Sequence, residues 1–141
     1  MDISVIASGL AFPEGPAVDP QGRLHWTEIA GQRIATLTPD GTVTTYADTG
    51  GGPNGCAFDA DGNLFVCNNG GSWPNVASTE QIGSGPNGQG SIQRISPDGA
   101  VETVLTEIDG QPLVGPNDCC FDAEGGLYFT DPDWSGAPAS V

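Results

Sequence analysis

Three segments of this chain repeat one residue pattern, and this repeat constrains the fold more than any other feature of the sequence. The segments span residues 14–24, 54–64 and 117–127 and align without gaps. Each contains a short apolar run and an Asp-x-x-Gly turn, and each leads into a second run that is rich in apolar and aromatic residues. Such runs around Asp/Gly turns are typical of β-hairpins.

A second hairpin follows each of the first two segments. Its turn reads Pro-Asp-Gly at residues 39–41 and again at 97–99. The runs that flank these turns are residues 33–37, 43–46, 92–95 and 101–105. Each unit therefore has four antiparallel strands, and the step from Asp19 to Asp59 is 40 residues. Four strands every 40–45 residues or so are typical of a propeller blade, and no amphipathic helix pattern occurs. The sequence predicts an all-β, partial β-propeller.

The whole chain, residues 1–141, is expected to form a single incomplete propeller domain. Blade 1 is expected at about 8–50, blade 2 at about 51–110 and the start of blade 3 at about 111–141. Within blade 2, residues 68–90 are rich in Gly, Ser, Asn and Pro and predict a long surface loop. Because an open ring exposes strand edges and apolar faces, we expect a second copy or a missing C-terminal half to complete it.

The charge of the chain argues against two classes of partner. Its formal net charge is −15, from 18 acidic residues against three arginines. Such a surface repels phosphate backbones and anionic lipids, so we expect neither a nucleic acid nor a membrane as partner. The N-terminal segment lacks a signal-peptide pattern, and no apolar stretch reaches transmembrane length. A cytoplasmic protein with reduced thiols is expected.

Four cysteines and one histidine give no zinc-binding pattern, because no CxxC is present. Cys119 and Cys120 are adjacent and should face opposite sides of a strand. Cys56 and Cys67 could face each other across a hairpin, although buried free thiols are the favoured interpretation. His25 is expected at a strand surface rather than in a catalytic role.

Polar residues occupy one shared position of the repeat, at the start of the innermost strand. These residues are Glu14, Asn54 and Asn117, and equivalent positions lie at the same height around a propeller axis. Carboxylate and amide oxygens suit Ca²⁺ or Mg²⁺ rather than Zn²⁺ or copper. The alternative is that Gly-Pro-Asn-Gly is simply a turn. Trp73, in the long loop, is a further candidate for ligand contact.

Four motifs, in this order, resemble the N-terminal half of the SMP-30/gluconolactonase/LRE family. They are FPEGP at 12–16, GPNG at 52–55, GPND at 115–118 and LYFTDP at 127–132, and the resemblance covers about residues 8–136. It implies a six-bladed propeller that hydrolyses sugar lactones or related cyclic esters with a divalent metal in its central channel. Ca²⁺ is the expected ion, with Zn²⁺, Mn²⁺ or Mg²⁺ as alternatives.

The resemblance also implies roles for individual residues. Glu14 matches the metal carboxylate of the first blade, and Asn117 matches a channel asparagine that contacts metal or substrate. Asn54 is similar to a further channel asparagine, and Asp118 to an acid beside the metal ligands. The catalytic base is expected beyond Val141. Alternatives are a non-catalytic binding platform with a structural metal, or another propeller enzyme, such as a strictosidine-synthase-like protein or a sugar oxidoreductase.

Overall fold

The computed structural model describes residues 2–71 and 89–133, and within these ranges the chain contains β-strands and no helix. The first sheet has the order β1-β2-β3-β4, and the second has the order β5-β6-β7-β8. All their neighbouring strands are antiparallel. A separate hairpin, β11-β12, follows them. The prediction of an all-β fold built from four-stranded blades is confirmed.

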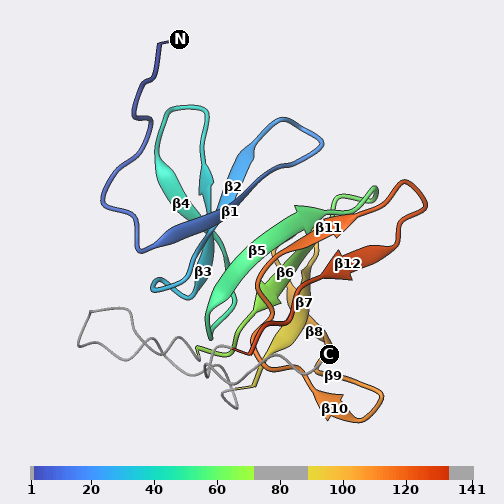
Figure 1. Cartoon of the computed structure of the whole chain (residues 1–141). Coiled ribbons are helices and arrows are strands. Elements are labelled where there is room, and N and C mark those ends of the chain that lie inside the picture. Colours follow the sequence, from blue (N-terminus) through green and yellow to red (C-terminus); the bar gives the residue numbers. More distant parts are fainter. Residues whose placement is uncertain (1, 72–88, 134–141) are drawn as a thin grey trace.

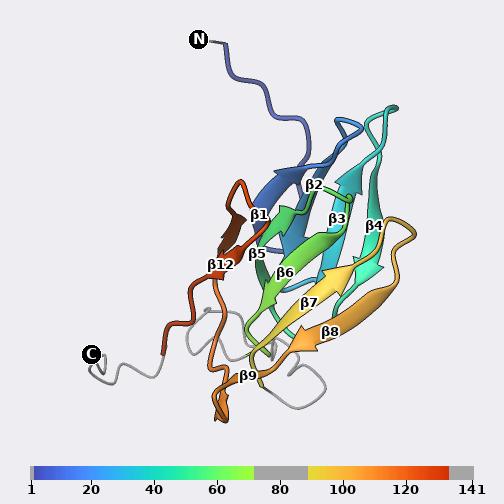
Figure 2. The same ribbon diagram turned by 90° about the vertical axis from the view of Figure 1, so that its right-hand side faces the viewer.

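Blade 1 is the first sheet and consists of β1 (Pro13–Val18), β2 (Leu24–Glu28), β3 (Arg33–Leu37) and β4 (Val43–Asp48). Blade 2 is the second sheet and consists of β5 (Pro53–Phe58), β6 (Leu64–Asn68), β7 (Ser91–Ile95) and β8 (Val101–Leu105). The blade 3 hairpin consists of β11 (Cys119–Phe121) and β12 (Leu127–Phe129). Figure 2 shows the two four-stranded sheets packed beside each other, with the hairpin next to blade 2.

The Asp-x-x-Gly turns have the same structure in all three blades. In blade 2, Asp59 Oδ1 accepts hydrogen bonds from the backbone N–H groups of Asp61 at 2.9 Å and Asn63 at 2.8 Å. Asp19 and Asp122 accept the equivalent pairs of bonds in their own turns. The turn glycine has a positive φ, 82° at Gly62, which only glycine adopts without strain. The sequence repeat is therefore a structural repeat.

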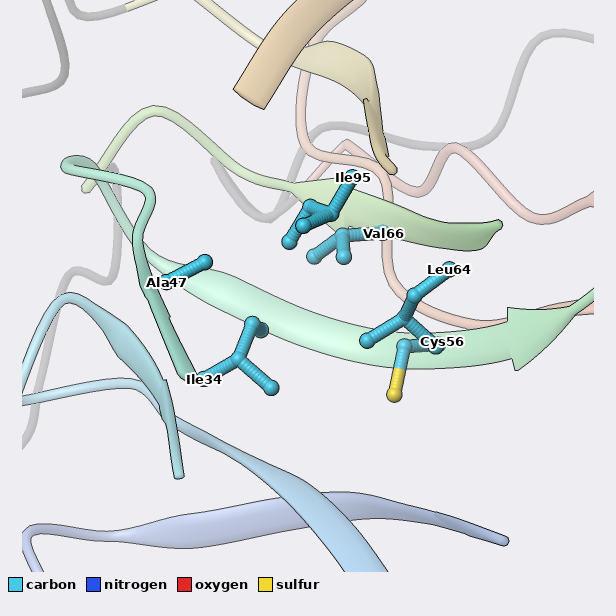
Figure 3. Close-up of a cluster of buried hydrophobic side chains, with 6 residues drawn as sticks. All are labelled: Ile34, Ala47, Cys56, Leu64, Val66 and Ile95. Carbon is cyan, nitrogen blue, oxygen red and sulfur yellow. The ribbon is translucent and has the colours of Figure 1, made fainter. Parts of the chain in front are cut away.

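Apolar side chains fill the interface between blade 1 and blade 2. Figure 3 shows this cluster, which comprises Ile34, Ala47, Cys56, Leu64, Val66 and Ile95. A second cluster between blade 2 and blade 3 contains Cys67, Ile92 and Leu113, with Cys119 and other half-buried side chains packed against it. Since each blade buries one face against the next, the packing fixes the spacing of the innermost strands.

His25 lies inside this packing, so its expected place at a strand surface is wrong. Its side chain is 1% exposed and packs edge-on against Tyr46 and Phe58. His25 Nε2 lies 3.2 Å from Asp19 Oδ2, which also accepts a bond from Arg23 Nε at 2.6 Å. Burial opposes ionisation of Asp19, but the bonds from Arg23 and His25 outweigh it and lower the pKa of Asp19 to about 2.

Cys56 and Cys67 are buried free thiols, as the favoured interpretation expected, and the alternative that they face each other is wrong because they face opposite sides of blade 2. Cys56 is the cross-strand partner of Val66, not of Cys67. Adjacent residues of a strand point to opposite faces. Cys56 therefore packs toward blade 1, and Cys67 packs toward blade 3. All four cysteines are free thiols.

One element has no counterpart in the sequence analysis. A small hairpin, β9 (Glu107–Ile108) and β10 (Gln111–Pro112), lies between β8 and the blade 3 hairpin. Its turn consists of Asp109 and Gly110, with φ values of 51° and 76°. Positive φ at both central residues is the geometry of the tightest hairpin turns. Most of the predicted loop 68–90 lies outside the described residues, since residues 72–88 are not described. Its first residue, Asn68, is the last residue of β6.

Candidate functional site

The innermost strands of neighbouring blades come very close together at the residue that follows each shared polar position. Figure 1 shows β1, β5 and β11 side by side near the centre of the structure. The backbone N–H of Gly55 donates to the carbonyl oxygen of Asn117 at 2.6 Å. A Cβ atom at Gly15 would lie 2.6 Å from the carbonyl oxygen of Asn54. Glycine at these two positions therefore permits direct backbone contact between blades.

This close approach brings four predicted residues together around one cavity of about 190 Å³. Glu14 comes from β1, Asn54 from β5, and Asn117 and Asp118 from the segment that leads into β11. The remaining lining residues are Phe12, Gly15, Pro16, Ile29 and Gly55. The structure therefore places the side chains that share a repeat position at one site, although Glu14 and Asn117 are 103 residues apart in the chain. Trp73 lies outside the described residues.

The amide of Asn54 is the most unusual group in this cavity. Asn54 is 5% exposed, yet its side chain has no hydrogen-bond partner among the residues that the structure describes. The amide of Asn54 is therefore available to a ligand or water in the cavity. Glu14 is exposed, and among the described residues its Oε2 accepts only the N–H of Gly15, at 3.3 Å. Asn117 is half-buried, and its side chain also has no partner in the described ranges.

The donor set of the cavity fits a hard cation. Glu14, Asn54 and Asn117 offer one carboxylate and two amide oxygens, and the lining contains no cysteine or histidine. Oxygen ligands of this kind are those that Ca²⁺ and Mg²⁺ take. Within residues 2–71 and 89–133, no three His, Cys, Asp or Glu side chains form a metal cluster. Amide oxygens would therefore provide most of the ligands that these residues contribute.

Asp118 differs from the other three residues because its carboxylate is already engaged on one side. Its Oδ1 accepts the N–H of Cys119 at 2.8 Å, whereas Oδ2 has no hydrogen bond within the described part of the chain. Its backbone carbonyl accepts the N–H of Thr130 at 2.9 Å. Asp118 is thus held at the cavity with one oxygen directed by the backbone and one available to a ligand.

Two further side chains position the cavity asparagines, and the sequence analysis missed both. Asn68 Oδ1 accepts the N–H of Gly52 at 2.9 Å, and Asp131 Oδ1 accepts the N–H of Gly115 at 2.7 Å. Gly52 and Gly115 each precede a cavity asparagine by two residues. Both acceptors lie 14 residues after the asparagine that they support, at the end of the second strand. This repeated spacing is the signal that could have revealed them.

The described residues form no helix that could span a bilayer. The chain matches the family described as "SMP-30/Gluconolactonase/LRE-like region" over residues 12–140. It is 31% identical over 143 residues to strictosidine synthase-like 3 from Arabidopsis thaliana. This alignment covers 84% of the chain and 32% of that protein.

Solved structures give the same picture of the fold. A gluconolactonase from Xanthomonas campestris is similar with a TM-score of 0.72 and 28% identity, over 90% of this chain and 37% of that one. A second putative gluconolactonase has a TM-score of 0.71 and 22% identity, over 93% of this chain and 40% of that one. Virginiamycin B lyase from Staphylococcus aureus shares the fold with a TM-score of 0.62, 22% identity and coverage of 86% and 35%. The chain therefore spans about a third to two fifths of the length of these relatives.

Proposed function

The chain belongs to the SMP-30/gluconolactonase/LRE-like family, and on that premise we propose that it contributes the first blades of a metal-dependent lactonase. The observation that carries the proposal is the cavity in which Glu14, Asn54 and Asn117 meet from three neighbouring blades. Substrates would be sugar lactones or related cyclic esters, as the gluconolactonase relatives suggest. The activity is proposed for the complete propeller, because this chain covers only part of its relatives.

The chemistry of each cavity residue suggests its role in the proposed reaction. The carboxylate of Glu14 and the amide oxygens of Asn54 and Asn117 would hold a divalent cation, with Ca²⁺ as the expected ion. Such an ion polarises a lactone carbonyl as a Lewis acid when it is bound. Asn54 is buried and held in place by the strand, so its amide needs little rearrangement to bind.

Asp118 is suited to orient a reactant rather than to bind the ion directly. The N–H of Cys119 fixes its Oδ1, so that Oδ2 remains as a hydrogen-bond acceptor at the cavity. A carboxylate in this position accepts a hydrogen bond from water or from a substrate hydroxyl group. We therefore assign Asp118 an orienting role, which matches its placement beside Asn117.

Calorimetric titration of Ca²⁺ into the protein tests the metal site. Glu14→Gln removes the only carboxylate that β1 contributes to the cavity and should weaken Ca²⁺ binding by roughly tenfold or more, since ligand charge sets affinity. Glu124→Gln is the matched control, because Glu124 lies in the β11–β12 turn and makes the same change of charge outside the cavity. Equal affinities for the two variants would remove Glu14 from the site.

A pH-indicator assay over a panel of γ- and δ-lactones tests the reaction. Ring opening should require Ca²⁺, Mn²⁺ or Zn²⁺ and should stop in chelator. The relative from Arabidopsis thaliana supports one alternative, a strictosidine-synthase-like reaction on the same fold. If the complete propeller opens no lactone with any metal while Ca²⁺ still binds, the non-catalytic binding platform replaces the lactonase.

A further inference from the structure

Two of the four cysteines, Cys67 and Cys119, meet at the interface between blade 2 and blade 3. Cys67 lies on β6 and is fully buried, with 0% exposure. Cys119 lies on β11 and is half-buried, and both side chains belong to the apolar cluster around Ile92 and Leu113. The Cys119 Sγ lies 3.9 Å from the carbonyl oxygen of Phe65, also on β6. Both side chains therefore pack into the same cluster, on facing strands of the two blades.

The repeat shows that this thiol pair is specific to one interface. Thr27 occupies the position of Cys67 in blade 1, and Cys56 occupies the position of Cys119 in blade 2. The corresponding pair between blade 1 and blade 2 is therefore a hydroxyl and a thiol. Cys56 also donates to the carbonyl oxygen of Gly15 at 2.9 Å, which directs it toward blade 1. Among the described residues, the second interface alone offers two thiols at these matched positions.

We propose that Cys67 and Cys119 form a reversible disulfide that links blade 2 to blade 3 when a small disulfide oxidant, such as oxidised glutathione, is supplied. In the first step, the Cys119 thiolate attacks one sulfur of the oxidant and releases one thiolate. In the second step, the Cys67 thiolate attacks the Cys119 sulfur of the mixed disulfide and releases the other. The oxidant accepts two electrons and, with the two protons from the cysteines, becomes two thiols.

The surroundings of the two cysteines support this order of attack. Cys119 is partly exposed and can meet an oxidant, whereas Cys67 is reached only by its neighbour. Cys67 is therefore the natural resolving thiol rather than the first nucleophile.

The disulfide would lie directly next to the candidate site. Cys119 follows the cavity residue Asn117 by two positions, and Asn117 is bonded to Gly55 of blade 2 through its carbonyl oxygen. A disulfide to β6 would tie the segment that carries Asn117 to the blade that carries Asn54. This consequence for Ca²⁺ binding rests on the proposed function, whereas the disulfide itself does not.

Peptide mapping by mass spectrometry tests the proposal on the unmodified chain. The protein is incubated with oxidised glutathione, its remaining thiols are blocked, and it is digested without reduction. A cross-linked peptide pair containing Cys67 and Cys119, lighter by two hydrogen atoms, is the expected product, and reductant should reverse it. A stable glutathione adduct at Cys119 without the cross-link, or a bond from Cys119 to Cys120 or Cys56, would overturn the proposal.

Variants separate the pair from the other thiols. A Cys56→Ser/Cys120→Ser background should form the same cross-link to the same extent, because Cys120 faces away from blade 2 and Cys56 faces blade 1. Adding Cys119→Ser should abolish it, and loss of the cross-link in the background itself would count against the pair. Ca²⁺ titration before and after oxidation separates the two proposals. A cross-link without any Ca²⁺ binding would refute the metal site and leave the disulfide standing.

Discussion

Gly55→Ala should weaken the contact between blade 2 and blade 3 more than any other single methyl group on an inner strand. The new Cβ would lie 2.5 Å from Cα of Asp118 and 2.8 Å from the carbonyl oxygen of Asn117, and it would also overlap Asp118 Oδ1. Side-chain atoms can move away, but two of these three contacts are with backbone. The strands β5 and β11 must therefore separate.

Two effects of this separation lower the free energy of unfolding: overpacking and the loss of a hydrogen bond. Overpacking of a tight contact typically costs about 1–3 kcal/mol. The 2.6 Å bond from Gly55 N–H to Asn117 is lost as the strands part, and a typical hydrogen bond contributes about 0.5–1.5 kcal/mol. Together they lower the free energy of unfolding by about 1.5–4.5 kcal/mol. A smaller Ca²⁺ affinity should accompany the change, because Asn54 and Asn117 move apart.

Urea unfolding followed by circular dichroism measures this loss. Gly41→Ala is the control, since Gly41 has a φ of 84° and a Cβ there would meet nothing within 4 Å. Gly41→Ala should cost only the strain of an alanine with a left-handed backbone conformation, about 1–2 kcal/mol, and should leave Ca²⁺ binding unchanged. If Gly55→Ala is no more destabilising than Gly41→Ala, the close approach of the inner strands is not a determinant of this fold.

Three further predictions concern other parts of the structure. Arg33→Met should lower the free energy of unfolding by about 3–5 kcal/mol, because it leaves the buried Glu28 carboxylate without the guanidinium nitrogens that lie 3.0 Å away. Glu28→Gln should cost less in the same urea titration, and an equal or larger cost would contradict this. Burial lowers the pKa of His25, so the folded state binds fewer protons than the unfolded state, and stability should fall as the pH drops through about 6.5. His25→Gln should flatten that dependence, whereas an unchanged slope would assign it to another group. Asp131→Ala should weaken Ca²⁺ binding by roughly tenfold, as is usual for residues that support ligands, while Asp131→Asn keeps the acceptor for Gly115 and should retain most of the affinity.

The hairpins of this fold could be predicted from the sequence because their determinants are local. An Asp at the start of each turn and a glycine three residues later satisfy the backbone groups of that turn alone. The same reasoning should have found the β9–β10 hairpin. Asp109-Gly110 is a strong two-residue turn signal, but its flanking strands have only two residues each and show no alternating pattern of their own.

The face of the sheet to which a given side chain points could not be predicted as well, because it depends on the register between neighbouring strands. A shift of one residue moves a side chain to the other face of a sheet. The ladder of blade 2 shifts between Pro53 and Cys56, so that Cys56 pairs with Val66 rather than with Phe65, which lies on the same face of the strand as Cys67. Nothing in the local sequence fixes this shift. His25 was misplaced for a related reason, since its burial depends on Tyr46 and Phe58 from other strands.

The repeat predicts the height of the cavity residues, but the residue that follows each one controls how closely the next blade approaches. Gly15 and Gly55 hold this position in blades 1 and 2 and leave room for the backbone of the next inner strand. In the third repeat the position is occupied by Asp118, whose exposed side chain lies at the cavity. A strand that packed against β11 as β5 packs against β1 would collide with this carboxylate. A strand that follows β11 in the sheet order would therefore have to pack farther from it than β5 packs from β1, which leaves the carboxylate of Asp118 room beside Asn117.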